Sequence, residues 1–167
     1  MTPIGIIFWL GLSVLFIFAS LWLDNLLPMH LSLPTLTKIF ISVPLLIIAV
    51  ILAPGTVYSF IKARGSPVPF NPPKELVTTG LYSRTRNPML LGWFIMLFGL
   101  GILLNSISLL LIFTPLFICL NIVYLRTIEE KEMEKKLGKQ YLEYKKNVPM
   151  FIARFGKRSR FHQFGKR

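Results

Sequence analysis

Hydrophobic positions along this chain gather in four runs that are separated by short polar stretches. The first two runs, residues 4–23 and 39–61, are long enough to cross a bilayer as helices, which takes about 20 apolar residues. The last two runs, residues 88–104 and 107–125, are joined only by Asn105-Ser106. So short a joint predicts a tight antiparallel helical hairpin, in which the third helix is short for a full crossing.

Proline and asparagine positions mark several of the expected helix boundaries. Pro44 and Pro54 fall inside the second run, where kinks are expected that neighbouring helices can repair. Asn87 followed by Pro88 predicts a helix start, because Asn is a good N-cap and Pro suits the first helical position. Residues 24–38 are expected to form a short polar crossing between the first two helices.

Beyond Arg126 the pattern changes to a charged helix with one apolar stripe. Apolar side chains recur there at three- and four-residue spacing, at Met133, Leu137, Tyr141, Tyr144 and Val148. Such a helix either lies at the membrane interface or packs back on the bundle. Gly138 weakens the helix and is expected to divide it in two.

Composition and charge agree with a membrane protein. Of the 167 residues, 53% are hydrophobic and 16% are charged, whereas soluble domains carry about 25% charged residues. From Lys145 onward the chain has eight Lys or Arg and no acid. Beside membrane spans, such a tail favours anionic lipid over nucleic acid as its partner. The predicted fold is all-α, an integral membrane bundle of about four transmembrane helices with a C-terminal interfacial amphipathic helix.

The charges also predict an orientation for this multi-pass chain. Residues 62–87 and everything after Arg126 are basic, whereas residues 24–38 carry only Asp24 and Lys38, and the joint at 105–106 carries no charge. Positively charged loops stay in the cytoplasm, so both termini are expected there. The polar loop before Pro88 and the C-terminal segment should then share the cytoplasmic face.

A group of charged residues is expected where the fourth helix leaves the membrane. Arg126 and Glu130 are four residues apart and should share a helical face, with Glu129 beside them. Charges so close to hydrocarbon mark either a helix-end salt bridge or a functional site. The hairpin should bring this exit close to the helix start at Pro88, whose free amide donors suit a carboxylate or phosphate. Together with Tyr82, these residues predict a cytoplasmic-side pocket.

Other motifs add little chemistry. Gly92, Met96 and Gly99 fall on one face of the third helix and would admit a neighbouring helix or a ligand equally well. No pair of cysteines or histidines has the spacing of metal ligands, so no metal is expected. Neither a P-loop nor a GxGxxG motif is present.

Three stretches follow, in order and spacing, the pattern of one enzyme family. They read LVTTGLYSRTRNPMLLG from Leu76, RTIEE from Arg126 and LGKQYLEYKKNVP from Leu137. In these stretches the chain resembles the isoprenylcysteine carboxyl methyltransferase family, in particular its bacterial and archaeal branch, which is related to phospholipid methyltransferases. The resemblance covers residues 64–150.

The resemblance implies an S-adenosylmethionine site outside the usual Rossmann-type fold. By motif position the cofactor would be held by Leu76, Val77, Tyr82, Asn87, Pro88 and Glu130, with Lys74, Glu75, Met89 and Leu90 at its edge. Arg126 matches the family's substrate-facing arginine. Leu90 stands where the family has tyrosine, so a hydroxyl that could donate to the cofactor is missing.

Two kinds of methyl acceptor stay open. A carboxylate is already a nucleophile, so Arg126 need only orient it. An amine must first lose a proton, which Glu129 or a nearby water could accept. The resemblance favours carboxyl or similar methyl transfer to a lipophilic small molecule or a lipidated acceptor that arrives through the membrane lipid.

Two functions of other kinds fit part of the pattern. One is an NADPH-dependent membrane lipid reductase, because some membrane sterol reductases share a similar C-terminal bundle. The other is a non-enzymatic scaffold whose basic tail binds anionic lipid. In the methyltransferase interpretation, residues 1–63 form N-terminal transmembrane helices, residues 64–150 the methyltransferase core, and residues 151–167 a basic tail.

Overall fold

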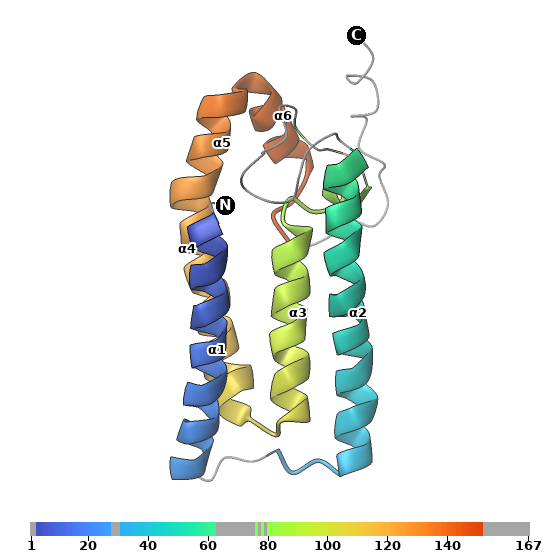
Figure 1. The fold of residues 1–167 in the computed structure, drawn as a ribbon, viewed down its shortest axis with the longest axis vertical. Coiled ribbons are helices and arrows are strands. Elements are labelled where there is room, and N and C mark those ends of the chain that lie inside the picture. Colours follow the sequence, from blue (N-terminus) through green and yellow to red (C-terminus); the bar gives the residue numbers. More distant parts are fainter. Residues whose placement is uncertain (1–2, 28–30, 63–75, 77, 79, 152–167) are drawn as a thin grey trace.

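The computed structural model describes residues 3–27, 31–62, 76, 78 and 80–151, which form a bundle of antiparallel helices (Figure 1). The first three helices are α1 (Pro3–Leu26), α2 (Thr35–Lys62) and α3 (Pro88–Leu103). The fourth is built from η2 (Leu109–Phe113), α4 (Thr114–Tyr124), η3 (Leu125–Glu129) and α5 (Glu130–Leu137), and α6 (Lys139–Asn147) then turns back toward the bundle. The described residues contain no β-strand, which confirms the all-α prediction.

Three of the described helices are long and apolar enough to cross a membrane. They are Ile7–Leu26, Thr35–Leu52 and Leu109–Leu137, and Pro88–Leu103 is apolar but shorter. With 16 residues, α3 is about 24 Å long, which is less than the roughly 30 Å of bilayer hydrocarbon. The structure confirms a helical membrane bundle whose third helix is short, as its apolar run predicts.

The fourth helix continues well past the expected end at Leu125. It runs without a break through the charged residues to Leu137 and ends at Gly138, whose φ is 53°. Glu, Lys and Met are good helix formers, so nothing between Leu125 and Gly138 stops the helix. Polarity changes along this helix while the helix itself stays continuous, although its backbone is π-helical at η2 and η3.

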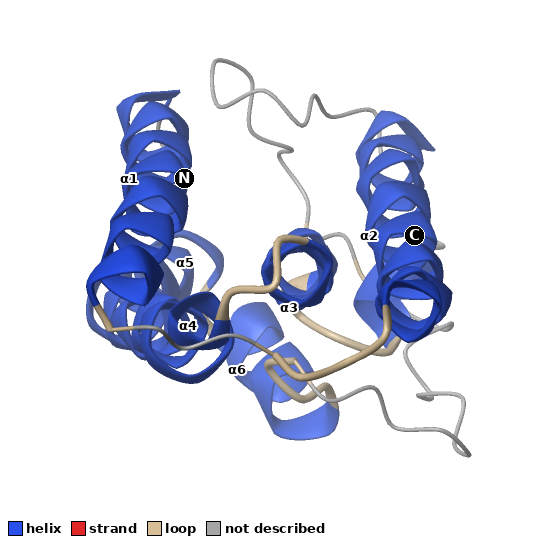
Figure 2. Ribbon diagram, turned by 90° about the horizontal axis from the view of Figure 1, so that it is seen from below, coloured by secondary structure: helices blue, strands red, loops and turns tan. Residues whose placement is uncertain are grey.

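Two glycines let α2 and α3 approach closely. A Cβ at Gly92 would lie 3.1 Å from Leu52 Cβ, and one at Gly99 would lie 3.1 Å from Leu46 Cδ2. Seen along the bundle, α3 lies between α2 and α4, and α1 lies beside α4 (Figure 2). Of the two alternatives for the glycine face of α3, a neighbouring helix is the one that the structure supports.

Aromatic rings join the other helices. Phe117 on α4 is fully buried, and its ring lies 5.6 Å from that of Trp9 on α1 and 6.2 Å from that of Phe94 on α3. Both pairs meet edge to face, the favourable arrangement for aromatic rings. With buried Leu97, these residues form the core that fixes α1 and α3 against α4.

The polar crossing at residues 24–38 differs from its prediction. Asp24 belongs to α1 and is only 3% exposed, because its carboxylate is bonded to the turn between α3 and η2. It accepts hydrogen bonds from the Ser106 hydroxyl and from the Ser108 N–H, the second at 3.1 Å. The carboxylate therefore accepts a hydrogen bond from an N–H group at a helix start, where the helix itself offers no partner. Asp24 therefore joins the end of α1 to the hairpin between α3 and η2, and α1 extends far enough to include it.

Loss of this buried carboxylate should destabilise the bundle. Asp24→Ala leaves the Ser106 hydroxyl and the Ser108 N–H without their acceptor, which should lower the free energy of unfolding by about 1–3 kcal/mol. Thermal unfolding in detergent micelles measures the loss. Asn25→Ala is the matched control, because Asn25 is the exposed neighbour. Equal stability of Asp24→Ala and the wild type would contradict this role.

Candidate functional site

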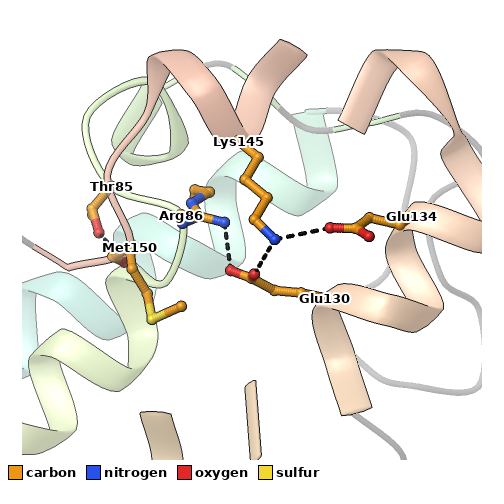
Figure 3. A network of polar contacts seen from close by, with 6 residues as sticks. All are labelled: Thr85, Arg86, Glu130, Glu134, Lys145 and Met150. Carbon is orange, nitrogen blue, oxygen red and sulfur yellow. Dashed lines mark hydrogen bonds and ion pairs between the residues drawn. The ribbon is translucent and has the colours of Figure 1, made fainter. Parts of the chain in front are cut away.

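The polar stretch before α3 is bonded to the segment that follows α6. The N–H groups of Arg86 and Asn87 donate to the carbonyls of Pro149 and Met150, at 2.9 and 3.2 Å. Thr85 Oγ1 adds a bond of 2.9 Å to the Met150 carbonyl (Figure 3). Two segments that the charge pattern predicts on one face of the membrane therefore lie against each other.

Helix α6 covers this stretch with its apolar face. The Tyr144 hydroxyl donates a 2.7 Å hydrogen bond to the carbonyl of Tyr82 in η1 (Gly80–Ser83). Around it lies a cluster of buried and half-buried side chains, Tyr141, Tyr144, Val148, Leu76, Met133 and Leu137. The side chains of the predicted apolar stripe thus gather in one cluster between α5, α6 and Leu76, and Gly138 divides the helix as predicted.

Glu130, the first residue of α5, is the centre of the site (Figure 3). Its side chain is only 6% exposed, and each carboxylate oxygen meets a cation: Arg86 Nη1 lies 2.5 Å from Oε1, and Lys145 Nζ lies 2.6 Å from Oε2. Lys145 Nζ also lies 2.8 Å from Glu134 Oε1. Because a buried carboxylate is costly unless it is paired, these contacts hold the start of α3, the start of α5 and α6 at one point.

The hairpin thus produces the predicted meeting of two polar borders. Arg86 stands two residues before the buried Pro88, which begins α3, and reaches Glu130 directly. The site lies at the end of the bundle where α1 begins and where α5 and α6 turn (Figure 1). The prediction that the start of the third helix and the exit of the fourth lie together is confirmed.

Arg126 and Glu130 do not share one environment, although their spacing predicts it. Arg126 is exposed on η3 and Glu130 is buried, because the π-helical turn between them changes the register of the fourth helix. Among the described residues the expected salt bridge between Arg126 and Glu130 is not formed, and Glu130 pairs with Arg86 and Lys145 instead. Glu129 is half-buried on η3. The assignment of Arg126 to substrate stays a prediction.

Burial and charge set the protonation of groups around the site. Burial raises the pKa of the Tyr82 hydroxyl well above its usual value, and the nearby Glu129 charge raises it further. Burial likewise raises the pKa of Tyr144. Hydrogen bonds to Glu130 and Glu134 raise the pKa of Lys145, which therefore remains an ammonium at neutral pH. The raised pKa values keep the Tyr82 and Tyr144 hydroxyls neutral at neutral pH.

The other residues predicted to bind cofactor fall into three groups. Asn87 and Pro88 lie in the site, Asn87 through its backbone. Leu76 packs against the tyrosines of α6, and Leu90 packs against the aromatic core. Met89, which precedes Leu90, is 45% exposed. Lys74, Glu75 and Val77 lie outside the described residues. Leu90 thus occupies an apolar environment in this fold.

Three residues of the ion-pair network are absent from the predicted set: Arg86, Glu134 and Lys145. Arg86 belongs to the resemblance motif and immediately precedes Asn87, so its place in the motif was the available signal. Lys145 is one of many lysines in a basic segment, and nothing in its local pattern distinguishes it. Among the described residues, no group of three or more His, Cys, Asp and Glu could hold a metal ion.

Comparison with known proteins identifies the family. A profile of the phospholipid methyltransferase family matches residues 37–140, more than half of the chain. The chain belongs to this family. The family includes the isoprenylcysteine carboxyl methyltransferases, and membership supports a membrane methyltransferase whose methyl donor, by family, is S-adenosylmethionine. No protein of curated function matches this methyltransferase.

Removal of Arg86 should destabilise this end of the methyltransferase. Arg86→Met leaves the buried Glu130 carboxylate with Lys145 alone, so we expect a loss of about 1–3 kcal/mol in the free energy of unfolding. Unfolding in detergent measures the loss, and Arg84→Met is the matched control because Arg84 is exposed. A loss as large in Arg84→Met would show that the effect is general to this basic turn.

Proposed function

We propose that this chain is an integral membrane, S-adenosylmethionine-dependent methyltransferase that acts on a lipophilic acceptor, in the first place an isoprenylcysteine-like carboxylate. The observation that carries the proposal is the buried Glu130, held by Arg86 at the border of the apolar helices in a chain of the phospholipid methyltransferase family. Family membership favours this function over a lipid reductase or a scaffold.

The donors and acceptors at the site fit the cofactor. Arg86 has a buried Nε that lacks a hydrogen-bond partner among the described residues, and a ligand carboxylate would satisfy it. Glu130 offers carboxylate oxygens to an ammonium group, and Tyr82 offers a neutral phenol. When bound, S-adenosylmethionine supplies a methyl group on a sulfonium sulfur, which keeps the C–S electron pair as the methyl group leaves.

The task of the chain's own residues is to position the acceptor and exclude water. Arg126 is exposed on η3, one turn before Glu130 and at the end of a long apolar helix. Among the described residues it has no ion-pair partner, so its guanidinium is available to a carboxylate that reaches the site from the lipid. Covalent catalysis is unnecessary, because the acceptor oxygen is itself the nucleophile.

Glu129 favours an amine acceptor as the second candidate. It is half-buried next to Glu130, and its charge acts on the Tyr82 hydroxyl. A carboxylate in this position could accept the proton that an amine must lose before or during methyl transfer. The two candidates differ in which side chain is essential, Arg126 for a carboxylate and Glu129 for an amine.

We also propose that the site faces the cytoplasm. Exposed lysines at the site end of the molecule include Lys131, Lys135, Lys136, Lys139 and Lys146. At the opposite end, Lys38 donates to Asn105 Oδ1 at 3.3 Å and Asp24 is buried. The positive-inside rule therefore supports a cytoplasmic position for the end that carries Glu130.

Calorimetric titration tests the cofactor assignment. The purified protein should bind S-adenosylmethionine and its demethylated product but not NADPH. Glu130→Gln should weaken this binding by about tenfold or more, because a charge-assisted hydrogen bond to the ligand is lost. Glu132→Gln, an exposed glutamate of the same helix, is the control. Tight NADPH binding would support a reductase, and salt-sensitive binding of anionic lipid alone would support a scaffold.

Acceptor assays with two variants separate the candidates. With an isoprenylated cysteine analogue as acceptor, Arg126→Gln should raise the KM by about tenfold or more and leave cofactor affinity unchanged, because only the acceptor contact is lost. Glu129→Gln should retain this activity. Methylation of phosphatidylethanolamine that is lost in Glu129→Gln and retained in Arg126→Gln would instead establish the amine.

A further inference from the structure

The two cations on Glu130 are held very differently. The Arg86 side chain is 11% exposed and lies in a turn whose backbone is bonded to Pro149 and Met150. The Lys145 side chain is 37% exposed and has a second carboxylate, Glu134, within 2.8 Å. Arg86 is therefore a fixed partner of Glu130, whereas Lys145 can leave Glu130 and keep an ion pair.

The proposed cofactor carries an ammonium group like that of Lys145, which pairs with Glu130 Oε2. The α-ammonium of S-adenosylmethionine has the same charge and the same three N–H donors as the lysine ammonium. Its sulfonium has charge but no N–H donor, so it cannot replace a hydrogen bond to Glu130. The cofactor ammonium and Lys145 would thus compete for a single carboxylate oxygen.

We propose that Lys145 is an exchangeable counter-ion of the cofactor site. Before cofactor binds, Lys145 neutralises Glu130 at Oε2, which spares α5 a buried charge with only one partner. On binding, Lys145 yields Oε2 to the cofactor ammonium and remains on Glu134, while Arg86 stays on Oε1. This inference rests on the proposed function and adds a residue that sets cofactor affinity.

Glu134 has a defined part in this exchange. It stands four residues after Glu130, one turn further along α5, and its side chain is 34% exposed. Lys145 therefore moves between two carboxylates of one helix and keeps contact with at least one of them. Because the lysine never has to return to bulk water, its displacement costs less than breaking an isolated ion pair.

Titration of Lys145→Met with S-adenosylmethionine tests the proposal. The variant lacks the competing ammonium, so we expect its Kd to fall about threefold to tenfold below that of the wild type. Lys146→Met is the matched control, because Lys146 is the exposed neighbouring lysine, and its Kd should not change. Methylthioadenosine, which lacks the ammonium, should bind Lys145→Met and the wild type equally.

A double-mutant cycle provides the second measurement. Glu134→Gln removes the alternative partner of Lys145, so it should weaken S-adenosylmethionine binding in the wild-type background. In the Lys145→Met background the same change should have no effect, because no lysine remains to be accommodated. This non-additivity is specific to exchange, since independent contributions would add. Melting temperatures of all variants verify folding.

The outcomes separate this inference from the function on which it rests. Tighter binding by Lys145→Met together with non-additivity at Glu134 supports exchange. If Lys145→Met binds S-adenosylmethionine as the wild type does or more weakly, Lys145 is structural and the inference is overturned while the proposed function stands. If neither the wild type nor any variant binds S-adenosylmethionine, the proposed function and the inference are overturned together.

Discussion

A carboxylate at the edge of hydrocarbon must be paired, and the pairing of Glu130 organises this protein. The carboxylate belongs to the helix that crosses from α4 into α5, while its cations come from the turn before α3 and from α6. Neither cation can reach Glu130 unless the hairpin closes and α6 folds back. One ion-pair network therefore requires the arrangement that also assembles a polar site beside the membrane.

Each end of the bundle has a buried carboxylate that bonds to a distant segment, Asp24 at one end and Glu130 at the other. At the end that carries the joint between α3 and the fourth helix, Asp24 accepts a hydrogen bond from the Ser108 N–H, and Lys38 donates to Asn105. At the other end, Arg86 retains a buried donor and Lys145 remains partly exposed. The contacts of Asp24 join helices of the fold, whereas the donor of Arg86 that is unpaired among the described residues is the one that the proposed function assigns to a ligand.

The site depends on helices that contribute no charge to it. Glycines bring α2 against α3, and the rings of Trp9, Phe94 and Phe117 fix α1 and α3 against α4. Because α3 and α4 are fixed in this way, the start of α3 and the start of α5 keep their separation. An apolar scaffold therefore positions the polar residues, as expected where binding groups must be held in place.

Local patterns were sufficient to predict the helices, the start of α3 at Pro88, the tight joint at Asn105, and the division of the last helix at Gly138. Each follows from backbone and side-chain preferences that act over a few residues. Only folding decided that Glu130 pairs with Arg86 and Lys145, that Arg126 is exposed and that Asp24 is buried in α1. Those outcomes depend on which distant segments meet and on the π-helical turn η3. A buried charge pairs with whichever opposite charge the folded helices bring close to it.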